Sequence, residues 1–100
     1  MHFVLMVDWI ESERGWGMRP DGVSLHLDEE DKKIFINNYW ERMPSDVPDE
    51  YSRPESGTVV AVNAQVFSRL KGVDTGLRLG EQEINKLIRE GSIVRYDRRD

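Results

Sequence analysis

The chain has 100 residues, of which 38% are hydrophobic and 33% are charged, with a formal net charge of −5. This length suits one domain, residues 1–100, and the apolar fraction is too high for a disordered protein. The absence of cysteine excludes disulfides, thiolate nucleophiles and most structural zinc sites. No apolar run is long enough for a membrane span, and the first residues lack a basic leader and a cleavage site. We therefore expect a cytoplasmic protein.

Acidic residues are concentrated in the first half of the chain. Residues 1–50 carry five Lys and Arg against 12 Asp and Glu, a net −7, whereas residues 51–100 carry nine against seven, a net +2. An acidic protein repels nucleic acid and anionic membranes at long range. Direct nucleic-acid binding is therefore disfavoured, and a protein with a basic surface is the more natural partner.

The first quarter of the chain predicts two strands. Residues 3–10 are apolar on both alternating faces except at Asp8, a pattern typical of a strand covered on both sides. The sequence Pro20-Asp21-Gly22 indicates a turn, because proline presets φ and glycine accepts positive φ. Residues 23–27 then alternate between apolar and polar, which predicts a half-buried strand.

A helix is predicted over residues 28–43. Asp28 is a good N-cap, and the three acids that follow it are favoured by the helix dipole. Ile36, Tyr39, Trp40 and Met43 recur at helical spacing and predict one buried stripe. Pro44 ends this helix, and three prolines within residues 44–57 indicate a loop.

The rest of the chain alternates between short strands and helices. Strands are expected at 58–62, 77–79 and 92–96, and helices at 63–71 and 81–90, with Asn63 as an N-cap and Gly72 and Gly91 at helix ends. The pattern predicts an α+β fold: a mainly antiparallel sheet of four or five strands with about three helices packed mostly on one side.

No catalytic, metal or phosphate motif is recognisable. The acids at 28–31 cannot converge on one ion, because consecutive helical positions point about 100° apart. His26 is expected on the polar face of its strand, as a surface histidine near a helix N-terminus. The sequence therefore favours a non-enzymatic protein without a cofactor or bound metal.

Aromatic and arginine side chains, the types that anchor interfaces, are frequent between residues 9 and 53. Trp9, Tyr39 and Trp40 are expected in the core. Trp16 lies between two glycines beside Arg19 and is expected either to pack in its loop or to contact a partner. The candidate contact residues for a basic partner are Trp16, Arg19, Asp21, Glu29, Glu30, Asp46, Asp49 and Glu50.

Two other functions remain open. The order of elements in residues 63–98 is similar to that of a winged-helix DNA reader, with Lys86, Arg89, Arg95 and Arg98 on phosphates, although the expected recognition helix begins with acids. A small hydrolase or ligand-binding protein is the other alternative, and it would require a deep pocket near His26.

Part of the chain resembles a known group of sequences. The run W-x-M-R-P-D-G-V-S-L-H-L-x-E-E-D, followed by F-I-x-x-Y-W and P-x-E-Y-S-R-P, is similar to a pattern in uncharacterised small proteins of bacteriophages and bacterial mobile elements. The residues that carry it are Trp16, Arg19, Pro20, Asp21, Gly22, Ser24, Leu25, His26, Leu27, Phe35, Ile36, Tyr39, Trp40, Pro48, Glu50, Tyr51, Ser52, Arg53 and Pro54. The resemblance carries over no site residue. It implies an inhibitor of host defence of the anti-CRISPR type, acting in the bacterial cytoplasm by occupying a basic nucleic-acid-binding surface.

Overall fold

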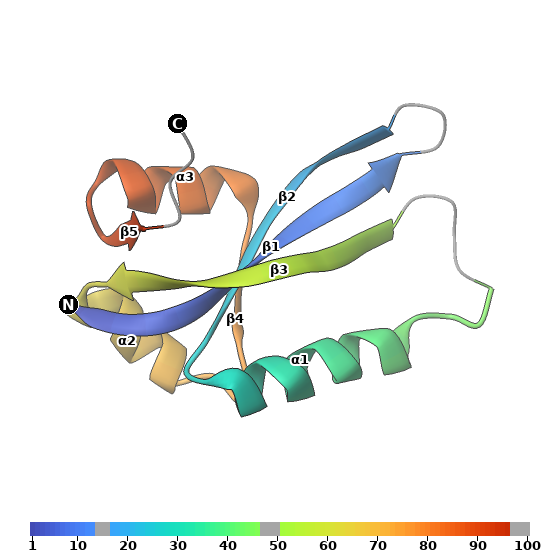
Figure 1. Ribbon diagram of the computed structural model, residues 1–100, viewed down its shortest axis with the longest axis horizontal. Helices are drawn as coiled ribbons and strands as arrows, with labels where there is room; N and C mark the ends of the chain where they lie inside the picture. The colour runs from blue at the N-terminus through green and yellow to red at the C-terminus, as the bar shows by residue number, and fades with distance from the viewer. Residues whose placement is uncertain (14–16, 47–50, 97–100) are drawn as a thin grey trace.

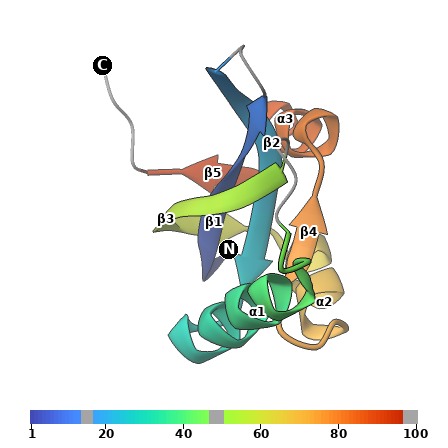
Figure 2. The ribbon, with the colours of Figure 1, turned by 90° about the vertical axis from the view of Figure 1, so that its right-hand side faces the viewer.

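The structure is a computed structural model that describes residues 1–13, 17–46 and 51–96. Its elements are β1 (His2–Glu13), β2 (Gly17–His26), α1 (Glu29–Arg42), β3 (Tyr51–Val62), α2 (Ala64–Lys71), β4 (Leu77–Leu79), α3 (Glu81–Arg89) and β5 (Ile93–Arg95). The strands form one antiparallel sheet in the order β4-β2-β1-β3-β5, with the two shortest strands at its edges (Figures 1 and 2). This confirms the predicted α+β class.

β1 is the central strand and pairs with a neighbouring strand along each edge. Its two apolar faces indicate a central position in the sheet. Opposite Trp9, each neighbouring strand contains one extra residue. Between residues 8 and 10 of β1, the paired residue of β2 changes from 23 to 20, three positions for two. Between residues 7 and 9 of β1, the paired residue of β3 changes from 57 to 54, again three positions for two. Such bulges bend a strand and increase its twist. Two bulges at the same level therefore divide the sheet into a proximal part and a three-stranded distal ribbon, which comprises residues 10–13, 17–20 and 51–54.

The main apolar core lies on one face of the proximal sheet. Buried side chains of β1, β2 and β3 pack there against Val66 and Leu70 of α2 and Ile84 of α3. Each fully buried aliphatic side chain stabilises the fold by about 1.5–3 kcal/mol. The core residues are Val4, Met6, Val23, Leu25, Val60, Val62, Val66, Leu70, Leu79, Ile84 and Ile93.

Helix α1 covers the opposite face of the sheet, where its Phe35 and Tyr39 rings contact Trp9. In Figure 1 the central strands run between α3 and α1. Two helices thus share one face, as predicted, and the third does not. No residue of α1 is fully buried, and Trp40 is 40% exposed. The prediction that Trp40 lies in the core is wrong, because the side of α1 that faces the sheet is centred on Phe35 and Tyr39.

Two segments predicted as a turn and a loop belong to strands. Residues 20–22 lie inside β2, and residues 51–57 are the first part of β3. Proline is tolerated in a strand where its missing N–H faces no neighbour. β4 pairs only with positions 23–25 of β2, and β5 only with positions 60–62 of β3. Pro20 and Pro54 both lie outside these ladders, which explains why the turn and loop predictions failed.

The predicted helix caps are confirmed. The Asp28 carboxylate accepts a hydrogen bond from the Asp31 N–H at 2.8 Å, and the Asn63 side chain accepts one from the Val66 N–H at 2.9 Å. Gly72 caps the C-terminus of α2. These local signals locate α1 and α2 correctly to within two residues.

Gly22, in the β2 bulge, is expected to tolerate no side chain. Its φ is +80°, and a Cβ at this position would lie 2.1 Å from the Leu79 carbonyl oxygen of β4. Because backbone must move, Gly22→Ala should lower the free energy of unfolding by at least about 3 kcal/mol. Gly91 also has positive φ, +78°, but open space around it, so Gly91→Ala should cost only about 1 kcal/mol. Urea denaturation measures both, and equal losses would show that the bulge does not require glycine.

Candidate functional site

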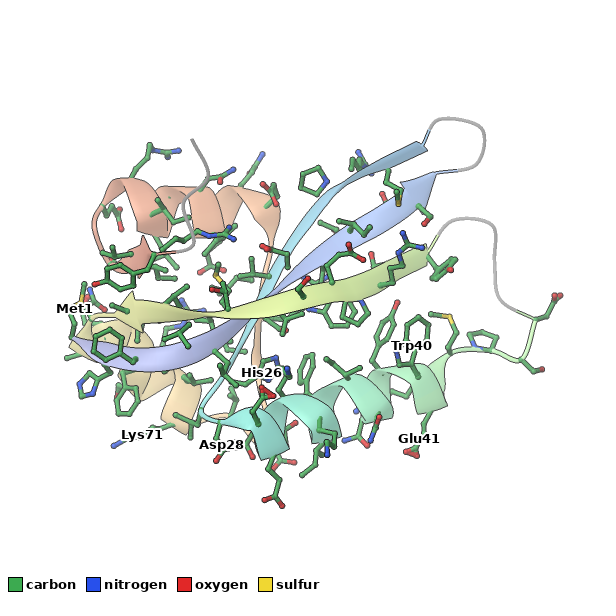
Figure 3. The ribbon with its side chains drawn as sticks, viewed as in Figure 1. Met1, His26, Asp28, Trp40, Glu41 and Lys71 are labelled. Carbon is green, nitrogen blue, oxygen red and sulfur yellow. The ribbon has the colours of Figure 1, made fainter. Side chains whose placement is uncertain are left out.

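A buried chain of hydrogen bonds runs from β1 to the loop before β4. Trp9 Nε1 donates to Ser24 Oγ at 2.8 Å. Ser24 Oγ lies 2.7 Å from His26 Nε2, and His26 Nδ1 lies 2.8 Å from the Thr75 carbonyl oxygen. Figure 3 shows His26 between the sheet and α1.

The hydrogen-bond partners determine the tautomer of His26. A carbonyl oxygen can only accept, so Nδ1 carries the proton and donates to Thr75. Nε2 of the neutral ring then accepts from the Ser24 hydroxyl. Ser24 Oγ in turn accepts from the Trp9 indole, so each donor in the chain has an acceptor. A second proton on His26 would make Nε2 a donor and leave the Ser24 hydroxyl hydrogen without this acceptor.

A serine hydroxyl bonded to a histidine that is oriented by a third group is the arrangement used to activate a nucleophile. Here Ser24 and His26 are both fully buried, and no substrate reaches the hydroxyl. The nearest cavity, of about 190 Å³, is lined by Phe35, Asn38, Arg42 and residues 74–76, but by neither member of the pair. Among the described residues, Ser24 and His26 are therefore closed to solvent, and this cavity is not the deep pocket at His26 that a hydrolase or ligand-binding protein would need.

The prediction that His26 is a surface residue is wrong. The alternation of β2 correctly put His26 and Ser24 on the face opposite Leu25, but α1 covers that face. Phe35 packs edge-on against the His26 ring, with 5.0 Å between centroids. On the other side, a Cβ at Gly76 would come within 2.6 Å of the same ring. Burial lowers the pKa of His26 below its usual value of 6.5, and the bond to Thr75 only partly opposes this effect.

Several of the predicted contact residues have charged partners within the chain. Asp21 accepts from Arg78 of β4 at 3.1 Å and also from the Ser52 hydroxyl. Arg19 pairs with Glu11 across the hairpin at 2.6 Å. Glu29 pairs with Lys32 within α1. These ion pairs connect neighbouring strands or successive turns of α1.

The other predicted contact residues are scattered or lie outside the described ranges. Glu30 is exposed at the start of α1, whereas Asp46 is exposed beyond its end, about 20 Å away along a 14-residue helix. Trp16, Asp49 and Glu50 fall outside the described residues. Two further acids are also paired: Asp8 with Arg95, and Glu55 with Arg53.

The structure instead reveals an open face on the distal ribbon. Tyr39 of α1 covers the other side of this ribbon by donating to the Ser52 carbonyl. On the open side, the pairing of Ile10 with Pro20 and Arg53 places these side chains together, next to Met18, which is 60% exposed. A groove of about 290 Å³ continues from Ile10 and Pro20 to Ile84 and Ile88 of α3.

Arg53 is the least satisfied polar group on this face. Its Nη2 donates to the Met18 thioether sulfur at 2.9 Å, and its Nε lies 3.7 Å from the Glu55 carboxylate. That Nε is buried and has no hydrogen-bond partner among the described residues. A thioether is a weak acceptor, so the guanidinium retains donor capacity for an incoming acceptor. The sequence predicts a loop over residues 44–57, and Arg53 is not among the candidate contact residues.

Comparisons with family models, curated proteins and solved structures found no match to this chain. Among the described residues, no helix combines the length and the apolar character needed to cross a membrane. The same residues contain no group of three or more His, Asp or Glu side chains able to hold a metal ion.

The lowered pKa of His26 predicts a loss of stability in mild acid. Below pH 6.5 the unfolded chain binds a proton on this residue while the folded chain does not. The free energy of unfolding should therefore be highest above pH 6.5 and fall as the pH drops below it, by up to about 1.4 kcal/mol per pH unit. Urea titrations between about pH 7 and 5 measure this slope.

The matched variants are His26→Gln, whose side-chain amide can still donate to Thr75, and His2→Gln, which leaves the buried chain intact. The His26→Gln slope should be shallower than that of the wild type, and the His2→Gln slope should be unchanged. If His26→Gln and the wild type lose stability in parallel, another group causes the acid sensitivity.

Proposed function

We propose that this protein is a non-enzymatic binding protein that contacts a protein partner through the open face of the distal ribbon. One observation carries the proposal. Three strands extend past the paired bulges and leave one side uncovered, with exposed Met18 and half-buried Ile10 and Arg53 beside a groove. Arginine and methionine are enriched at interfaces, and this part of the sheet adds little to the core.

The hydrogen bonds of Arg53 indicate which chemical group the partner would supply. The Arg53 side chain is 37% exposed, and its Nη2 donates to the Met18 thioether, a weak acceptor. A carboxylate or a backbone carbonyl of the partner would therefore add stronger hydrogen bonds at the exposed end of the guanidinium. Bonds to a charged donor are worth about 1.5–3 kcal/mol, while Ile10, Met18 and Pro20 supply apolar area around it. The proposed contact thus has a polar anchor within an apolar rim.

The expected basic partner is less well supported. That expectation required a continuous acidic surface, yet Asp8, Asp21 and Glu55 lie against arginines and the acids of α1 lie at its two ends. Long-range attraction to a basic surface would be weakened accordingly. Inhibition of a bacterial defence protein remains a prediction, and it would need a contact surface and no catalytic group.

The DNA-binding alternative receives little support from the geometry. Arg69 pairs with Glu83 at 3.0 Å, Lys86 lies 4.0 Å from Glu90, and Arg95 pairs with Asp8 at 3.1 Å. Cations held by carboxylates contribute less to a phosphate-binding surface. The strand between α2 and α3 pairs with β2 and not with β5, which also differs from a winged-helix arrangement.

The proposal is tested by a photo-crosslinking amino acid placed at Met18 or, as a control, at Ile34, which is exposed on α1. In lysate of the natural host, the Met18 probe should yield a discrete adduct with one protein, and the Ile34 probe should not. Adding Arg53→Ala to the Met18 probe should reduce the adduct yield about tenfold or more. With the purified adduct partner, Arg53→Ala should weaken binding by a similar factor, measured by calorimetry.

An Ile34 adduct as strong as the Met18 adduct, or a Met18 adduct unaffected by Arg53→Ala, would contradict the proposal. Circular dichroism of each variant shows whether the fold is retained.

A further inference from the structure

A second apolar surface that the described residues leave uncovered lies at the opposite end of the sheet, on the face that α1 covers only near β2. Phe3 pairs with Ala61, Ala61 with Val94, and Leu5 with Val59, so their side chains share this face. Tyr96 follows β5 and contacts Phe3, with 6.2 Å between ring centroids. We call this surface the proximal face: Met1, Phe3, Leu5, Val59, Val94 and Tyr96.

These side chains are unusually exposed for their type. Met1, Phe3 and Tyr96 are 63%, 66% and 59% exposed, and Val59 is 48% exposed. Figure 3 shows Met1 at the end of the molecule remote from Trp40. The distal ribbon cannot fold back to cover them, because β1 is an extended strand and Phe3 lies about 30 Å from Glu13 along it.

The area of the proximal face matches the lower limit of a biological protein interface. Using the size of aromatic and aliphatic side chains, the exposed parts of these four residues amount to roughly 400–450 Å². Leu5 and Val94 are partly exposed and raise the total to roughly 500 Å² per molecule. Two such faces would bury about 1,000 Å², the smallest area expected of a biological interface.

The charge distribution indicates which partner fits. None of the six side chains of the proximal face is charged at neutral pH, in a protein of which 33% is charged. A two-fold contact brings the same patch of two copies together, so any charge near the axis would face a like charge and be repelled by it. An uncharged, flat sheet face satisfies this requirement, and two such faces can stack about 10 Å apart.

We propose that the occupant of the proximal face is a second copy of this chain, which forms a two-fold dimer by stacking the two sheet faces. Phe3 and Tyr96 are the central contacts, and Leu5, Val59 and Val94 pack around them. The distal ribbons then point away from the interface, so the dimer presents two copies of the open ribbon face. The inference is independent of the proposed function, because the two surfaces share no residue.

Sedimentation equilibrium of the full chain tests the dimer. The mass should rise from 11.7 kDa toward twice that value with increasing concentration. Phe3→Glu, which places like charges across the two-fold axis, should raise the dissociation constant about a hundredfold, and Tyr96→Ser about tenfold. Tyr96 lies beyond the last strand, so its variant keeps the fold even if Phe3→Glu does not. Ile34→Glu on α1 and Met18→Glu on the distal ribbon should leave the dissociation constant unchanged.

A wild-type chain that stays monomeric at about 1 mM would overturn the inference and assign the face to a different molecule. Mass that increases beyond the dimer would overturn it as well, since a two-fold contact closes at two copies. Equal weakening by Met18→Glu and Tyr96→Ser would place the interface elsewhere. The Met18 crosslinking result depends on none of these outcomes, so the two proposals fail separately.

Discussion

The buried Trp9 indole holds several elements of this fold together. Its ring is 1% exposed, lies edge-on to Tyr39 of α1, and has the Arg78 guanidinium of β4 over it at 4.7 Å from the centroid. Its N–H donates to Ser24 of β2. One side chain of the central strand therefore contacts β2, β4 and α1, and both neighbouring strands bulge at its level. Bulges bend a strand and increase its twist, so the strands change direction at the level of this ring.

The helices differ in how firmly packing holds them. α2 and α3 each bury aliphatic side chains in the main core. α1 has no fully buried residue and is attached through ring contacts, the Asp28 cap and the hydrogen bond from Tyr39 to Ser52. Burying a polar pair such as Ser24 and His26 costs free energy unless every donor and acceptor is satisfied. α1 covers this pair and completes its burial. The helix therefore shields apolar surface and also favours the neutral form of His26.

Ion pairs link the two ends of the chain. Asp8 with Arg95 and Asp21 with Arg78 join residues 87 and 57 positions apart. Partly exposed pairs of this kind contribute about 0–1 kcal/mol each, which is small compared with the core. Their larger effect is on the surface potential, because Asp8 and Asp21 are neutralised by arginines of the second half. The two surfaces proposed for recognition, the open ribbon face and the proximal face, lie at opposite ends of one sheet.

The α+β class, the caps of α1 and α2 and the doubly apolar character of β1 could be predicted from the sequence, since these depend on residues close together in the chain. The burial of His26, the exposure of Trp40 and the strand conformation of residues 20–22 and 51–57 could not. Each of these depends on which element covers a given face or edge. Local alternation shows that two residues share a side, but it does not show whether a helix far along the chain will cover that side. The dispersal of the acids has the same cause, because their arginine partners are brought to them only when β4 and β5 pair with the sheet.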